Sequence, residues 1–153
     1  MITPAPDNLP ARAASGAPSA FFGWRALRTL ERIGDLMLPG DGGLPSFSAT
    51  GCLGYVDDLL AYMTPGDRAS LRLLLQVLSV FPDGGLRAFL RLLGLSARLP
   101  AALGAPLRLI ELGLKGLIMN LYYSNKTGPE YTGVRPFDVL GFDLTRIRDH
   151  RPA

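Results

Sequence analysis

Leucine-rich segments with a helical repeat, separated by proline and glycine, limit most strongly what this chain can fold into. Leu27, Leu30 and Ile33 recur at three-residue steps, which places them on one face of a helix over 22–38. Four further apolar segments predict helices over 54–63, 65–81, 86–95 and 106–123. β-Branched residues are sparse, so helix is favoured over strand. The sequence therefore predicts an all-α fold.

Length and composition indicate one small domain. With 153 residues, of which 48% are hydrophobic, the chain is long enough to close a core and too apolar to be disordered throughout. Its 18 glycines and 13 prolines gather between the apolar segments. We expect a single-domain bundle of about five helices over 21–125, with a flexible, disordered Pro/Ala-rich leader at 1–20 and an irregular tail at 126–153.

Two local patterns define helix starts. Thr64 precedes Pro65 and stands three residues before Asp67, which is typical of an N-cap hydroxyl with proline in the first turn. Asp57 and Asp58 fall in the first turn of the 54–63 helix, where the helix dipole favours negative charge. Neighbours on a helix point about 100° apart, so this acidic pair is not expected to converge on one metal or substrate.

The segments 65–81 and 106–123 are apolar nearly all round, so we expect both to be covered on every side, by neighbouring helices or by another surface. Gly113 and Gly116 each cost about 1 kcal/mol relative to alanine in a helix. We therefore expect another helix to approach them closely. Charged residues interrupt the second segment, and no stretch of 18 uncharged apolar residues occurs, so no transmembrane helix is predicted.

The chemistry-bearing residues indicate no catalytic, cofactor or metal site, so the chain is not expected to be an enzyme. The glycine-rich loop at 39–50 follows a helix and lacks a phosphate-binding motif. Cys52 is the one cysteine, without metal-ligand spacing, and is interpreted as a semi-buried structural thiol; His150, the one histidine, lies near the C-terminus. The net charge of +3 comes from scattered arginines rather than a basic run, which argues against nucleic-acid binding.

The tail carries more apolar side chains than a solvated linker needs. Tyr131, Val134, Phe137, Leu140 and Phe142 occur without a periodicity that would bury them in one element. Exposed apolar surface usually marks an interaction site. We therefore predict that the tail is loosely held in the isolated chain and contacts a partner through Tyr131, Phe137 and Phe142. The alternative is that it packs back and completes the core.

Two short motifs carry a family resemblance. Residues 36–41 read LMLPGD at a helix end, and residues 116–125 read GLIMNLYYSN before a Gly-Pro loop. In this order, over about 26–139, the chain resembles the small-subunit family typified by gluconate 2-dehydrogenase subunit 3. Its members are non-catalytic partners of flavin-dependent dehydrogenases of the glucose-methanol-choline type, whose large subunit carries the flavin. The resemblance marks Tyr122, Tyr123 and Ser124 as packing and partner-contact residues.

The resemblance implies an accessory subunit that binds and stabilises a large flavoprotein acting on an alcohol, sugar or sterol-like substrate. The family's members often carry a twin-arginine signal; neither this signal nor a secretory signal occurs here. We therefore expect a cytoplasmic protein that reaches the membrane, if at all, through its partner. The two nearly all-apolar helices leave two alternatives open: a helical protein that binds a lipid or other hydrophobic ligand, and a peripheral membrane protein.

Overall fold

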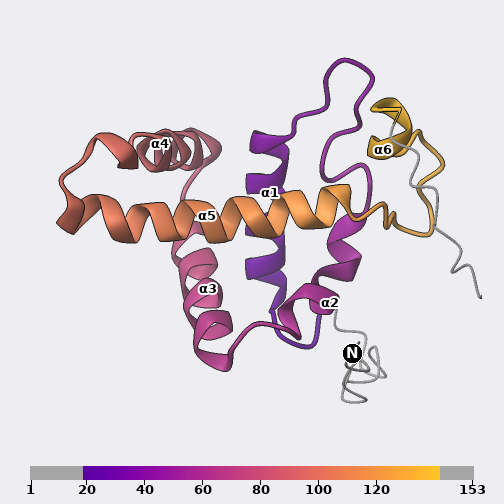
Figure 1. Ribbon diagram of the computed structural model, residues 1–153. Coiled ribbons are helices and arrows are strands. Elements are labelled where there is room, and N and C mark those ends of the chain that lie inside the picture. Colours follow the sequence, from indigo (N-terminus) through magenta and orange to yellow (C-terminus); the bar gives the residue numbers. More distant parts are fainter. Residues whose placement is uncertain (1–18, 142–153) are drawn as a thin grey trace, which may run out of the picture.

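The computed structural model describes residues 19–141 (Figure 1). Within this range the chain forms helices and turns and no strand, which confirms the all-α class. The elements, with η marking a 3₁₀-helix, are α1 (Trp24–Met37), η1 (Cys52–Tyr55), α2 (Val56–Leu60), α3 (Pro65–Leu78), α4 (Asp83–Gly94), η2 (Ser96–Arg98), α5 (Ala101–Tyr123) and α6 (Pro136–Val139).

The long helix α5 organises the molecule. In Figure 1 it runs across the molecule in front of α1, with α3 and α4 on either side of its N-terminal half and α6 beyond its C-terminal end. Side chains from all the longer helices and from the loop after α1 share one core. Its large, fully buried members are Leu30, Ile33, Phe47, Val56, Leu60, Leu75, Leu86, Leu93, Leu114, Ile118, Leu121 and Tyr122.

Helix α1 follows its predicted amphipathic pattern. Leu27, Leu30 and Ile33 are buried, as the three-residue spacing indicates. The helix ends at Met37, and the N–H of Leu38 donates to the carbonyl of Gly34 just before proline. The loop that follows is anchored rather than free, because the Phe47 ring is buried directly against Gly34.

Helix α3 has the predicted cap but not the predicted surroundings. Thr64 Oγ1 accepts a hydrogen bond from the N–H of Asp67 at 3.2 Å, so the helix begins where the sequence indicates. Leu75 and Leu78 are buried, whereas Leu73 and Val77 are exposed. Within the described residues, this chain therefore does not cover the segment on all sides, and cover by another surface stays a prediction. Its inward face packs on α1, and its outward face is an exposed apolar surface.

Helix α5 begins at Ala101, not at Pro106 as predicted, so that proline lies inside the helix. The earlier start depends on a tight turn from η2, where Pro100 is the N-cap residue and the carbonyl of Ser96 approaches Gly104. A Cβ at Gly104 would lie 2.6 Å from that oxygen. Pro106 led to the prediction that the first turn of the helix lies there. The close backbone packing at Gly104 instead sets the start of α5 at Ala101.

The expected close approach at Gly113 and Gly116 is wrong. A Cβ placed at either glycine would meet no neighbouring segment or side chain within 4 Å among the described residues. Leu109 and Leu112, which lie near these glycines along α5, are exposed. Within residues 19–141, helix α5 therefore packs on one side only, and its other side exposes large apolar residues and glycine.

Both ends of the described chain are tied to α2 and the loop before it. The Asp57 carboxylate accepts hydrogen bonds from Ser19 Oγ and, at 2.7 Å, from the N–H of Ala20, so these last residues of the predicted leader are anchored. In the predicted tail, the N–H of Gly128 donates to the carbonyl of Thr50 at 2.8 Å. The tail also contains α6, whereas the sequence indicated no element there.

Candidate partner-binding surfaces

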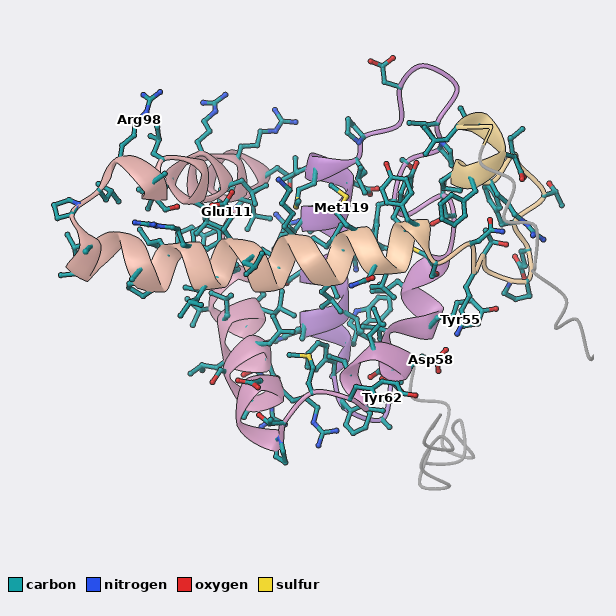
Figure 2. All side chains as sticks on the ribbon, in the orientation of Figure 1. Tyr55, Asp58, Tyr62, Arg98, Glu111 and Met119 are labelled. Carbon is teal, nitrogen blue, oxygen red and sulfur yellow. The ribbon has the colours of Figure 1, made fainter. Side chains whose placement is uncertain are left out.

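The residues with catalytic chemistry do not gather at one site in the described part of the chain. Asp57 holds the N-terminal segment, whereas Asp58 pairs with Lys126 at 2.7 Å, so the two carboxylates serve separate contacts. Figure 2 shows Asp58 beside Tyr55, whose ring centroid lies 5.5 Å from the Lys126 Nζ. Among residues 19–141, no three His, Cys, Asp or Glu side chains come close enough to hold a metal ion.

Cys52 and Tyr122 are enclosed in the core. Cys52 is fully buried rather than semi-buried, and burial raises the pKa of its thiol. Burial also raises the pKa of Tyr122 to about 12. Neither group is placed to become an anion near neutral pH, which is the opposite of what a nucleophile or general base requires. His150, the one histidine of the sequence, lies outside the described residues.

The tyrosine pair at the end of α5 divides into a core residue and a rim residue. Tyr122 is only 2% exposed, and its hydroxyl donates to the carbonyl of Pro45 at 2.6 Å. The prediction that Tyr122 contacts a partner is therefore wrong, because its side chain lies in the core. Tyr123 is half-buried, with its ring centroid 5.0 Å from that of Tyr122. Ser124 is exposed, and its hydroxyl donates to the carbonyl of Leu121.

Of the predicted contact residues of the tail, Phe137 lies against helix α5 and Tyr131 makes a contact within the tail. The Phe137 ring packs on Tyr123 with a centroid distance of 6.2 Å, and Tyr131 donates its hydroxyl hydrogen to the carbonyl of Val134. Both rings are half-buried. Residues 126–141 therefore pack back on the domain instead of hanging loosely, while Val134 and Leu140 stay exposed. Phe142 lies outside the described residues.

One exposed apolar surface lies on α5. Leu109 is 71% and Leu112 is 72% exposed, values far above those of the buried Leu114 and Ile118 on the opposite side of the same helix. Gly113 and Gly116 lie on the exposed side and leave the helix backbone open to a neighbour. The sequence indicated a contact at these glycines but could not tell whether this chain supplies it.

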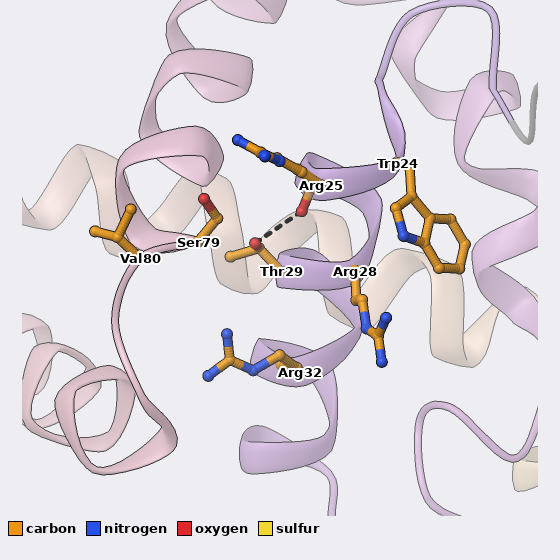
Figure 3. A pocket seen from close by; sticks show the side chains of 7 residues that line it. All are labelled: Trp24, Arg25, Arg28, Thr29, Arg32, Ser79 and Val80. Atoms are coloured by element: carbon orange, nitrogen blue, oxygen red, sulfur yellow. Dashed lines mark hydrogen bonds between the residues drawn. The ribbon is translucent and has the colours of Figure 1, made fainter.

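A second surface combines basic and apolar groups. Helix α1 and the end of α3 border an open hollow of about 600 Å³. Figure 3 shows its lining, which consists of Trp24, Arg25, Arg28, Thr29, Arg32, Ser79 and Val80. From the sequence, the arginines of the chain were interpreted only as scattered charges. The signal that this interpretation missed is their spacing, because Arg25, Arg28 and Arg32 are one helical turn apart beside an exposed indole.

The three arginines of the hollow differ in their partners. Arg32 is engaged, since its Nη2 lies 2.7 Å from Asp83 Oδ1 and 2.8 Å from the carbonyl oxygen of Phe81. The Arg28 guanidinium lies 5.7 Å from the centroid of the Trp24 ring. Within residues 19–141, neither Arg25 nor Arg28 forms an ion pair with a carboxylate. Two guanidinium groups thus remain open to an external anion.

Comparison with known proteins supplies no relative. No protein-family model matches the chain, and no curated protein or solved structure matches it either. Helices of the described range are each too short or too polar to cross a bilayer.

Proposed function

We propose that this protein is a non-catalytic subunit that binds a larger protein through the outward side of α5, and that its partner is the large subunit of a flavin-dependent dehydrogenase. The observation that supports docking is the exposure of Leu109 and Leu112 together with the open glycines, Gly113 and Gly116. We call these four residues the α5 face. Large apolar residues grouped on an exposed surface are typical of protein interfaces.

The glycines favour a helix as the contacting element of the partner. Glycine destabilises a helix interior by about 1 kcal/mol relative to alanine, and nothing in the described chain uses the space at Gly113 or Gly116. Small residues let another helix approach the backbone closely, while flanking leucines fill the grooves beside it. The α5 face therefore has the shape that a partner helix requires.

The identity of the partner rests on the family resemblance. The motifs at 36–41 and 116–125 imply a large flavoprotein that acts on an alcohol, sugar or sterol-like substrate. Tyr123, Ser124, Tyr131 and Phe137 surround the C-terminal end of α5, and their partner contacts stay predictions. The cytoplasmic location expected from the sequence is likewise a prediction, and on this proposal it follows the location of the partner.

The alternative of an enclosed hydrophobic ligand has less support. Between α1, α4 and α5 lies a mainly apolar hollow of about 160 Å³, bordered by Met37, Leu90, Leu93, Glu111, Leu114 and Lys115. Pockets for drug-sized ligands occupy about 300–1,000 Å³. A lipid chain would not fit this hollow without moving the helices, and the larger hollows among the described residues lie open at the surface. Docking of a macromolecule on the exterior is therefore favoured.

The proposal is tested by affinity isolation of the tagged full chain from its native cells. We expect a larger protein to co-elute in size-exclusion chromatography and to show the visible absorbance of a bound flavin. Leu109→Glu/Leu112→Glu should abolish this co-elution, because two carboxylates would have to be buried at the interface. The matched control is Leu92→Glu/Leu95→Glu at the end of α4, which also places two acids at exposed leucines and should retain the flavoprotein.

Three results would contradict the proposal. A captured partner without flavin would refute the dehydrogenase. Equal loss in both double variants would show that the α5 face is not the docking site. A homodimer of the isolated chain that is broken by the α5 variant would assign the face to a second copy of this protein instead.

A further inference from the structure

The charged residues that line the hollow between α1 and α3 are all positive. Among its lining residues are three arginines and no carboxylate. Asp83 approaches from outside the lining and neutralises Arg32, whereas Arg25 and Arg28 keep their charge available at the surface. Glu31 lies nearby on α1, where burial and then the charge of Asp35 raise the pKa of its carboxyl and Arg28 partly offsets this rise. The hollow is thus suited to anionic groups such as phosphates.

Apolar side chains continue the surface beyond the arginines. Trp24 is 62% and Val80 is 79% exposed at the rim of the hollow. Val77 and Leu73 precede Val80 by three and seven residues and are also exposed, which extends one apolar side along α3. We call Trp24, Arg25, Arg28, Val77 and Val80 the α1–α3 face. It combines an indole, two guanidinium groups that form no ion pair with the described residues, and aliphatic side chains.

We infer that the α1–α3 face attaches the protein to an anionic phospholipid bilayer. In a bilayer the phosphates lie directly above the acyl chains, so one surface offers partners to the arginines and to the valines together. Tryptophan is enriched at this level of membranes because its ring is amphipathic. A basic surface attracts anionic lipids, and adjacent apolar side chains enter the boundary between headgroups and acyl chains.

Other anionic partners match the face less well. A soluble phosphate compound would use Arg25 and Arg28 but would leave the 79% exposed Val80 without a partner. Single-stranded nucleic acid is bound by grooves that stack successive bases on several aromatic rings, and the hollow has one ring, that of Trp24. The bilayer is the partner that accounts for both the charge and the apolar stripe.

The full chain contains one tryptophan, so its fluorescence reports on this face directly. The isolated protein is titrated with phosphatidylcholine vesicles that contain or lack phosphatidylserine. We expect the emission of Trp24 to shift to the blue with the anionic vesicles alone, and the shift to weaken as salt is raised. Lipids brominated in the acyl chains should quench the emission, because the indole enters the boundary region.

Matched variants separate this face from general charge. One arginine near an anionic membrane contributes about a fivefold change in partitioning, so Arg25→Gln/Arg28→Gln should lower the partition coefficient roughly 25-fold. Val80→Asp should lower it as well, through the apolar contact. The control is Arg87→Gln/Arg91→Gln on α4, which removes two exposed arginines elsewhere and should change partitioning less than about threefold. Circular dichroism establishes that all variants are folded.

Several results would overturn the inference. It fails if neither vesicle changes the wild-type fluorescence, if the brominated lipids do not quench Trp24, or if the two arginine double variants lose binding equally. A shift produced by inorganic phosphate alone would indicate a site for small anions. A shift with single-stranded DNA but not with vesicles would indicate a nucleic-acid site. Because this test uses the isolated chain, its outcome is independent of capture of a flavoprotein by the α5 face.

Discussion

At the scale of single residues, two helical glycines have opposite surroundings. Gly34 of α1 is buried, and a Cβ there would overlap the ring of Phe47, which is itself fully buried. A Cβ on Gly116 of α5 would meet no described neighbour within 4 Å. The Phe47 ring, together with the hydrogen bond from the Tyr122 hydroxyl to Pro45, holds the 39–50 loop against the helices. The packing of the Phe47 ring against α1 therefore requires a residue without a Cβ at position 34.

We expect Gly34→Ala and Gly116→Ala to change stability in opposite directions. Gly34→Ala forces Phe47 to move, and overpacking of this kind costs about 1–3 kcal/mol, offset in part by the higher helix propensity of alanine. Gly116→Ala meets no neighbour and should raise the free energy of unfolding by about 1 kcal/mol. Urea denaturation followed by circular dichroism measures both. Destabilisation by Gly116→Ala would show that a segment covers the α5 face in the free protein.

Tyr122 should make stability depend on alkaline pH. Its pKa rises from 10.0 to about 12 on folding. Between these values the unfolded chain loses the phenolic proton while the folded protein keeps it, so the free energy of unfolding falls as pH rises. At pH 11 we expect a loss of about 1 kcal/mol from this group. In urea unfolding at pH 9 and 11, Tyr122→Phe should show a smaller decrease than wild type; an identical decrease would exclude this assignment.

At the scale of secondary-structure elements, capping decides where α3 begins. Thr64 Oγ1 accepts from the N–H of Asp67 at 3.2 Å and donates to the carboxylate of the same residue at 2.7 Å. Helix α5 has no such side-chain cap, and its start depends on the backbone packing of Gly104 against Ser96. The first kind of start is visible in a local sequence, whereas the second requires the neighbouring turn.

Loss of the Thr64 cap should destabilise the protein moderately. Thr64→Ala removes the acceptor for a helix N–H, which costs about 1 kcal/mol. Thr64→Ser keeps the hydroxyl and should stay within about 0.5 kcal/mol of wild type. Thermal unfolding of the two variants gives the comparison. Equal melting temperatures for the alanine and serine variants would show that water replaces the cap without loss.

At the scale of the whole molecule, a crossing of two loops attaches the C-terminal segment. The backbones of Gly51 and Gly128 are in contact, and a Cβ on Gly51 would lie 2.9 Å from the Cα of Gly128. Gly51 also has a positive φ of 64°. The pair of Lys126 with Asp58 and the ring contact of Phe137 with Tyr123 extend this attachment.

Gly51→Ala should release the C-terminal segment, because the added Cβ would break the contact between Gly51 and Gly128. We expect chymotrypsin to cut at Tyr131 and Phe137 slowly in the wild type and at least several-fold faster in the variant, because local opening exposes the sites. Gly42→Ala is the control, since Gly42 has a similar φ of 61° but no contact within 4 Å. It carries the cost of the left-handed conformation without the clash. Rapid cleavage of the wild type would instead favour the loosely held tail predicted from the sequence.

The sequence by itself determined the all-α class, the amphipathic face of α1 and the cap of α3, because these depend on periodicity and on contacts within a few residues. Only the tertiary structure decided that Tyr122 is a core residue, that the space at Gly113 and Gly116 is open, and that the described tail packs back. It also decided that the arginines of α1 meet Val80 of a later turn in one hollow. These outcomes depend on segments distant in the sequence, and a local pattern records which side chains can be buried but not which neighbour covers them.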